Sequence, residues 1–121
     1  MKKLGIPLIT NEGENSVISE HFGHAPYFGF VKIDGSNYEV EVIKNPMEEH
    51  GPGDIPNYMK ENDVNVMIVR GIGGRAIDFF NSLGIEVYRG AAGTIKDLVN
   101  AYLKDEIEDK EYEVKEKHHH H

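Results

Sequence analysis

The 121 residues include 21 acidic and 13 basic side chains, a formal net charge of −8, and 39% are hydrophobic. This length suits one hydrophobic core, and the negative charge argues against binding to nucleic acid. The absence of cysteine excludes disulfides, thiolate ligands and cysteine nucleophiles. We expect a cytoplasmic protein, because no stretch approaches the roughly 20 apolar residues of a membrane span and the N-terminus lacks a signal-peptide cleavage site.

The first half of the chain predicts three strands. The apolar run from Leu4 to Ile9 indicates a buried strand, in which Pro7 is tolerable only at an edge or an irregular position. Residues 27–33 and 38–43 are rich in aromatic and β-branched side chains, and they flank the turn Asp34-Gly35-Ser36-Asn37. This pattern predicts a β-hairpin.

The second half alternates helices with strands. Asp54 is expected to cap the first helix, and Thr94 with Asp97 forms a variant of the capping box at the last one. Gly84 suits the C-terminal cap of the middle helix. The predicted order is a helix from Asp54 to about Asn62, a strand at 64–69, a helix ending near Leu83, a strand at 85–88 and a helix from Thr94 to Leu103.

These elements predict a single domain at residues 1–104. A right-handed crossover makes the first strand and the two later strands parallel neighbours, and the hairpin extends the same sheet antiparallel. The predicted fold is a three-layer, ribonuclease H-like α/β fold with one mixed five-stranded sheet and three helices. Residues 105–121 are expected to form a solvated acidic tail. Its end, His118 to His121, is either an affinity-tag remnant or a native His-rich segment.

Three loops are expected to converge beyond the carboxyl ends of the parallel strands, where open sheets bind ligands. One loop carries His21 and His24, whose spacing places both imidazoles on one side of a helical turn. They are candidate ligands for one metal ion, and His50 is a candidate third ligand from the long loop before the first helix. The alternative is that one histidine packs against Phe22 and the other is solvated.

The second loop, Gly71-Ile72-Gly73-Gly74-Arg75-Ala76, fits Gly-x-Gly-x-x-Ala between a strand and a helix. Its backbone N–H groups, with the charge of Arg75, predict an anion site at the helix start. The alternative is that the glycines only allow close packing of helix and strand. The third loop is Arg89-Gly90-Ala91-Ala92-Gly93. Glu12, Glu14 and Glu20 are interpreted as a solvated loop face, and no two-metal nuclease or serine hydrolase pattern is present.

The stretch Ser19-Glu20-His21-Phe22-Gly23-His24-Ala25-Pro26-Tyr27-Phe28 resembles the Ser-x-His-Phe-Gly-x-Ala-x-x-Phe signature of the dinitrogenase iron-molybdenum cofactor biosynthesis family. The glycine turn at 71–73, the segment 83–87 and the helix start at 93–95 recur at similar places, so the resemblance spans roughly residues 3–103. It implies a ribonuclease H-like fold and a non-enzymatic role in binding, storing or delivering iron-sulfur or iron-molybdenum clusters. It implies that His21 is a cluster ligand, with His24 at the variable position of the signature.

We therefore expect transient cluster binding in metallocluster assembly, with cluster donor and acceptor proteins as partners and neither nucleic acid nor membrane. One alternative is a binding protein or enzyme for a small phosphorylated, nucleotide-like ligand, and another is a protein adaptor that uses the acidic tail. The oligomeric state stays open. The predicted cofactor-binding residues are His21, Phe22, Gly23, His24, Gly71, Gly73, Gly74 and Arg75, and the predicted metal ligands are His21, His24 and His50.

Overall fold

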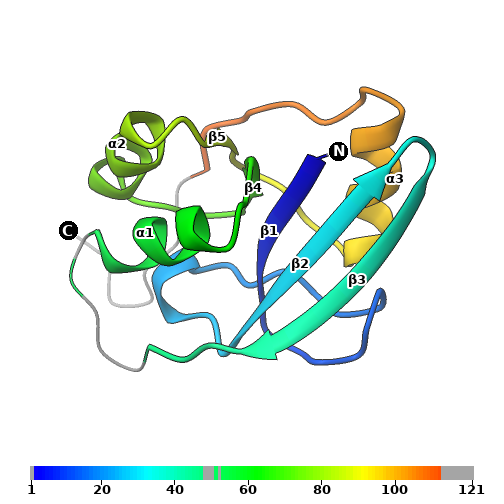
Figure 1. The fold of residues 1–121 in the computed structure, drawn as a ribbon, viewed down its shortest axis with the longest axis horizontal. Coiled ribbons are helices and arrows are strands. Elements are labelled where there is room, and N and C mark those ends of the chain that lie inside the picture. The colour runs from blue at the N-terminus through cyan, green and yellow to red at the C-terminus, as the bar shows by residue number, and fades with distance from the viewer. Residues whose placement is uncertain (1, 48–50, 52, 113–121) are drawn as a thin grey trace, which may run out of the picture.

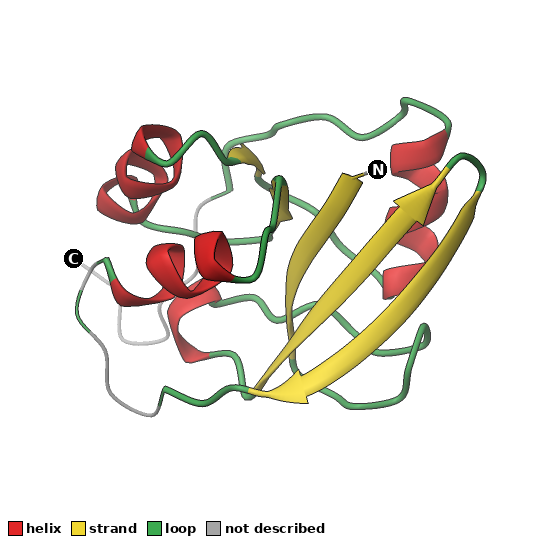
Figure 2. Ribbon diagram, viewed as in Figure 1, coloured by secondary structure: helices red, strands yellow, loops and turns green. Residues whose placement is uncertain are grey.

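The computed structural model describes residues 2–47, 51 and 53–112, and it contains every predicted strand and helix (Figures 1 and 2). Among these residues, no helix has the length and apolar character that a bilayer span requires. The strands are β1 (Lys2–Leu8), β2 (Tyr27–Asp34), β3 (Asn37–Lys44), β4 (Val66–Ile68) and β5 (Glu86–Tyr88); the helices are α1 (Asp54–Glu61), α2 (Gly74–Ser82) and α3 (Ile95–Leu103), with a 3-10 turn η1 (Phe22–His24).

The strands form one mixed five-stranded sheet in the order β3-β2-β1-β4-β5. β1 pairs antiparallel with β2 and parallel with β4, and β4 pairs parallel with β5. The hairpin of β2 and β3 closes with Asp34 opposite Asn37, and Gly35 adopts a φ of 64° in the turn. The predicted α/β architecture with a mixed sheet and three helices is therefore confirmed.

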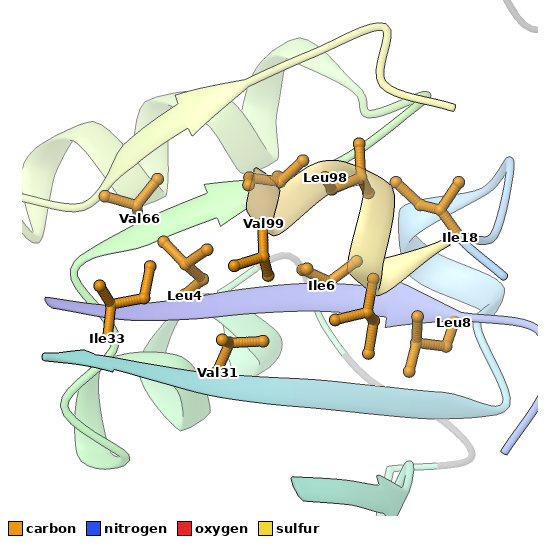
Figure 3. Packing of buried hydrophobic residues seen from close by; sticks show 11 residues of the cluster. Leu4, Ile6, Leu8, Ile18, Val31, Ile33, Val66, Leu98 and Val99 are labelled. Carbon is orange, nitrogen blue, oxygen red and sulfur yellow. The ribbon is translucent and has the colours of Figure 1, made fainter. Parts of the chain in front are cut away.

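Helices cover both faces of the sheet, so the sheet separates two cores. On one face, α3 packs against β1, β2 and β4, and Figure 3 shows Val99 and Leu98 above Leu4, Ile6 and Val31. On the other face, α1 and α2 bury the second core (Figure 1). The buried side chains of this core are Phe22, Ala25, Phe28, Phe30, Ile55, Met59, Val64, Met67, Val69, Phe80 and Ile85. Each core draws on sheet residues that alternate between the two faces.

Pro7 lies inside the central strand and pairs in regular register with Phe28, so the expectation of an edge or irregular position is wrong. Its carbonyl accepts a hydrogen bond from the Ser19 N–H at 2.9 Å. Because the nitrogen and carbonyl of one strand residue point the same way, the proline nitrogen faces the loop that follows β1 and not β2. The pairing of β1 with β4 involves only Leu4 and Gly5. Proline therefore removes no ladder hydrogen bond.

Two of the predicted helix starts differ in outcome. Thr94 caps α3 as expected, since its Oγ1 accepts from the Asp97 N–H at 3.2 Å and the Asp97 carboxylate accepts from the Thr94 N–H at 3.2 Å. The prediction that Asp54 caps α1 is wrong, because Gly53 occupies the cap position. Asp54 is the first helical residue, and its carboxylate instead accepts from the Gly51 N–H at 2.7 Å.

The segment after α3 runs along the edge of the sheet instead of leaving the domain. Most of residues 104–112 are exposed, as their charge predicts, but Ile107 packs against the α3 core. The Arg89 guanidinium donates to both carboxylate oxygens of Asp109, at 2.9 and 3.0 Å, and the Lys110 N–H donates to the Arg89 carbonyl at 3.0 Å. The interpretation as a solvated tail is therefore incomplete, because this part of it is fastened to β5.

Candidate functional site

The loops after β1, β4 and β5 meet at one edge of the sheet, beyond the carboxyl ends of these strands. The loop after β1 reaches the loop after β5, since the Ile18 N–H donates to the Gly93 carbonyl at 3.0 Å. The loop after β5 reaches the loop after β4, since the Gly90 N–H donates to the Arg70 carbonyl at 3.0 Å. The three predicted segments thus form one continuous surface, which is where open α/β sheets bind ligands.

The histidine turn and the glycine turn lie side by side and are joined through their backbones. His21 and Gly71 form a parallel bridge. The Phe22 N–H donates to the Gly71 carbonyl at 3.0 Å, and the Gly71 N–H donates to the Glu20 carbonyl at 3.0 Å. Two segments separated by about 50 positions in the sequence are therefore held in a fixed relation by two hydrogen bonds.

Buried neighbours hold the histidine turn in place. Ser19 is 5% exposed, and its Oγ accepts from the His21 N–H at 3.3 Å and donates to the His21 carbonyl at 3.1 Å. Phe22 is 6% exposed and packs edge-on against Phe80, with ring centroids 5.5 Å apart. Phe22, which the sequence placed among the binding residues, lies in the core and anchors the turn. The imidazoles of His21 and His24 remain exposed.

The two imidazoles are near neighbours on the same turn. Their ring centroids are 6.1 Å apart with the planes at 70°, close enough for both rings to turn toward one ligand. The Glu20 carboxylate lies 3.9 Å from His21 Nε2. Within the described residues no group of three or more histidine, cysteine or acidic side chains is arranged to hold a metal ion. The predicted third ligand, His50, lies outside these residues. The described part of the site therefore provides two candidate imidazole ligands, His21 and His24.

A shallow hollow of about 320 Å³ adjoins the histidine turn on the side of His24. Residues Gly71 to Gly74 are not among those that line it, so this hollow belongs to the histidine turn and the end of β3. Its lining residues are Gly23, His24, Ala25, Pro26, Lys44, Asn45 and Met47.

The glycine turn leaves bare backbone at the start of α2. A Cβ built on Gly73 or Gly74 would meet no atom of the described residues within 4 Å, and Gly73 has an ordinary φ of −80°. Neither close packing nor backbone strain therefore requires glycine at these two positions, so the close-packing interpretation does not hold for Gly73 and Gly74. The N-cap residue Gly73 has no side chain to satisfy the first N–H groups of α2, and the first turn contains no acidic residue. Arg75 adds an exposed cation, so the helix start is open to an anion.

Three further side chains at this edge were not among the predicted site residues. Glu20, interpreted as part of a solvated loop face, accepts a hydrogen bond from the Tyr112 hydroxyl at 2.6 Å. Arg70 stacks on the Tyr112 ring, with its Cζ 4.5 Å from the ring centroid. A signal existed for each: Glu20 lies inside the signature stretch, Arg70 immediately precedes the glycine turn, and Tyr112 is the one aromatic side chain after Tyr102.

Comparison with known proteins supports a family relationship. A profile described as dinitrogenase iron-molybdenum cofactor matches residues 2–105. The uncharacterized protein MJ0580 of Methanocaldococcus jannaschii is 30% identical over 112 residues, which cover 89% of this chain and 91% of that protein. The crystal structure of PH0822 superposes with a TM-score of 0.80 at 39% identity, covering 89% of this chain and 96% of that chain.

Two more distant structures share the fold. The NMR structure of TM1290 from Thermotoga has a TM-score of 0.74 at 24% identity, covering 96% of this chain and 99% of that chain. The apo form of the orange protein from Desulfovibrio gigas has a TM-score of 0.75 at 17% identity, covering 91% of this chain and 93% of that chain. The profile match over nearly the whole domain confirms the resemblance carried by the His-Phe-Gly turn. This chain belongs to the dinitrogenase iron-molybdenum cofactor family.

Proposed function

We propose that this chain is a cytoplasmic, non-enzymatic carrier that binds an iron-sulfur or iron-molybdenum cluster, or a precursor of one, and passes it from a donor protein to an acceptor protein. Family membership links the chain to the iron-molybdenum cofactor. The binding surface in this proposal is the edge at which the histidine turn meets the glycine turn. His21 and His24 supply the ligating nitrogens, and Gly73, Gly74 and Arg75 supply donors to the anionic part of the cargo.

One observation carries the proposal. The start of α2, where Gly73 and Gly74 leave the backbone uncovered, follows a turn that is joined to the histidine turn. Because His21 and Gly71 are bridged, a bound group in contact with the His21 imidazole is also near the start of α2. Clusters built from iron, molybdenum and sulfide are anionic, and this protein has a net charge of −8. An anionic cargo therefore needs a local electropositive notch, which the N–H groups after Gly73 and the charge of Arg75 provide.

The ligand set favours a carrier over a protein that binds its cluster permanently. Clusters that stay in place for electron transfer are held by cysteine thiolates, and this chain has no cysteine. Two exposed imidazoles bind less firmly than four thiolates, and they exchange with solvent and with competing ligands. If the cluster is bound weakly and at the protein surface, a second protein can reach it directly, as transfer between donor and acceptor proteins requires.

Anaerobic titration with an iron-sulfur or iron-molybdenum cluster tests the proposal. The chain is shortened to end at Lys117, because terminal histidines bind metal by themselves. We expect cluster absorption bands to change on binding, and His21→Ala to weaken binding by about tenfold or more, as the loss of groups around a metal site commonly does. His24→Ala is the comparison variant and loses less. Spectra that stay unchanged on titration, or equal affinity of His21→Ala and the unaltered chain, would end the carrier proposal.

A second candidate function is binding of a small phosphorylated, nucleotide-like ligand, which the open helix start also favours. A ligand that binds only the folded state raises the free energy of unfolding by RT ln(1 + [L]/Kd), and the unfolding temperature rises with it. Stabilisation by a nucleotide or by inorganic phosphate, with no response to clusters, selects this candidate. No stabilisation at millimolar ligand removes it. The adaptor hypothesis gains nothing from residues 105–112, because they contact the domain itself.

A further inference from the structure

Arg70 carries a cation directly before the glycine turn, and its donors are largely unused. Its Nη1 donates to the Ala91 carbonyl at 3.1 Å, and its Cζ lies 4.5 Å from the centroid of the Tyr112 ring. The hydrogen bond uses one of the five N–H donors of the guanidinium, and the second contact places its Cζ over the tyrosine ring. Within the described part of the chain Arg70 forms no ion pair. The remaining donors of the guanidinium edge are available to an anion.

Tyr112 contacts both Arg70 and the acidic residue Glu20. The backbone places Glu20 beside Arg70, because the Gly71 N–H donates to the Glu20 carbonyl at 3.0 Å. The Tyr112 hydroxyl donates to Glu20 Oε2 at 2.6 Å, and the ring of the same residue stacks on the Arg70 guanidinium. The tyrosine therefore satisfies the carboxylate with its hydroxyl and the cation with its ring face, so that the acid and the base do not neutralise one another.

The position of Tyr112 is fixed by the segment that precedes it. Asp109 accepts two hydrogen bonds from the Arg89 guanidinium and a third from the Arg89 N–H at 2.8 Å. The Lys110 N–H donates to the Arg89 carbonyl at 3.0 Å. Gly90 makes room for this contact, because a Cβ there would lie 2.7 Å from the Lys110 carbonyl oxygen. Three consecutive features of the fold thus bring Tyr112 back to the edge that carries the glycine turn.

We propose that Arg70 is the principal cationic contact for an anionic ligand at this edge, and that Tyr112 is its positioning residue. The inference rests on the carrier function proposed above and narrows the ligand to a compact, multiply charged anion rich in oxygen or sulfur acceptors, such as a molybdenum–sulfur species. A guanidinium edge with several parallel donors matches such acceptors better than a single backbone N–H does. Arg75, the cation that the sequence favoured, is exposed, and no residue of the described ranges forms a hydrogen bond or ring contact with its side chain.

Titration with tetrathiomolybdate, followed by its visible absorption under anaerobic conditions, compares Arg70→Gln with Arg75→Gln in the full chain without the terminal histidines. Both variants remove one positive charge from the same edge, so they are a matched pair. We expect Arg70→Gln to lose about tenfold or more in affinity, the usual value of a hydrogen-bonded charge contact, and Arg75→Gln to lose less than about threefold. Arg70→Lys is expected between them, because it keeps the charge and loses the planar donor edge.

A double-mutant cycle tests the role of Tyr112. Tyr112→Phe keeps the ring and removes the hydroxyl, which frees the Glu20 carboxylate to pair with Arg70, so we expect the affinity for tetrathiomolybdate to fall. Adding Glu20→Gln to this variant removes the competing charge and restores the affinity. A residue that merely stabilises the fold would not be rescued in this way. Failure of Glu20→Gln to restore binding, or full binding by Tyr112→Phe, overturns the positioning role.

The outcomes separate this inference from the carrier proposal. Binding by the unaltered chain that His21→Ala weakens, combined with equal losses in Arg70→Gln and Arg75→Gln, overturns the inference and leaves the carrier in place. No binding of tetrathiomolybdate or of clusters by the unaltered chain overturns both. Thermal unfolding of every variant is measured alongside, and a larger affinity loss in Arg70→Gln at an unchanged unfolding temperature is the result that supports the inference.

Discussion

Two glycine-bearing turns leave the sheet side by side, one after β4 and one after β5, and their glycines meet different surroundings. Gly90 and Gly93 have φ values of 79° and 109°, and an added Cβ would lie 2.7 Å from the Lys110 carbonyl and 2.9 Å from the Asp97 carboxylate. Gly73 and Gly74 have open space around them. The fold requires glycine at Gly90 and Gly93, so the presence of these two glycines carries no information about ligands.

The second pair has no structural requirement and therefore needs another explanation. Glycine in or beside a helix costs backbone entropy relative to alanine. A chain that keeps two glycines at the start of α2, beside a histidine turn, loses some stability and gains unobstructed access to the helix N–H groups. The comparison shows that a glycine points to a binding surface only when neither φ nor packing accounts for it.

Phe22→Ala gives the largest expected effect, because the histidine turn beside the open glycines depends on this anchor. Phe22 is 6% exposed and packs on Phe80. Truncating a buried phenylalanine costs about 3–5 kcal/mol of unfolding free energy. Urea denaturation measures the loss, and Phe22→Leu serves as the milder control. A loss below about 1 kcal/mol would mean that the hydrogen bonds of Ser19 and the backbone bridge to Gly71 hold the turn without this anchor.

Gly90→Ala tests whether the turn after β5 needs glycine for its structure. The positive φ and the collision with the Lys110 carbonyl are expected to cost about 1–3 kcal/mol of unfolding free energy. Gly13→Ala is the matched control, because Gly13 also has a positive φ of 60° but meets no described atom within 4 Å. Gly13→Ala therefore measures strain alone, and an equal cost in the two variants would show that the contact with Lys110 contributes nothing.

Gly74→Ala applies the same substitution to the open turn, with the opposite expected sign for stability. Unfolding free energy stays unchanged or rises by up to about 1 kcal/mol, because alanine favours the helix. Cluster binding falls, since a methyl group then covers backbone that the ligand approaches. Denaturation and anaerobic titration on the same preparation measure both. Unaltered binding in this variant would contradict the hypothesis that the open glycines keep the helix N–H groups accessible to a ligand.

Acidic pH is expected to have the smallest effect, through the contact between Asp109 and the turn after β5. Hydrogen bonds from Arg89 hold the pKa of Asp109 below its usual value, with burial opposing this shift. The lowered folded-state pKa means that the stabilising contribution is present above about pH 4 and is lost as the pH falls through the folded-state value. The NMR signal of the Lys110 amide, which donates to the Arg89 carbonyl, should therefore shift in acid as the segment detaches. Asp109→Asn should abolish that pH dependence, and its persistence would assign the transition to another carboxylate.

Local patterns were sufficient for most of the fold. The hairpin, the Thr94 cap and the strand order follow from alternation, turn chemistry and crossover handedness, which depend on neighbours in the sequence. Asp54 was misplaced by one position, because Gly51 in the preceding loop supplies a backbone donor that captures its carboxylate. Local reasoning fails in this way when a short polar side chain has two partners within reach.

Patterns in the sequence predicted the elements, their order and the likeness of the His-Phe-Gly turn to its family. They also placed both the histidine turn and the glycine turn at the carboxyl ends of the strands. The openness of Gly73 and Gly74 among the described residues and the role of Phe22 as an anchor became visible from the packing of the folded chain. The meeting of Tyr112 with Glu20, 92 positions apart, depends on the path of the whole C-terminal segment. Patterns of neighbouring residues carry no information about such a path, because it is set by packing and by hydrogen bonds between distant parts of the chain.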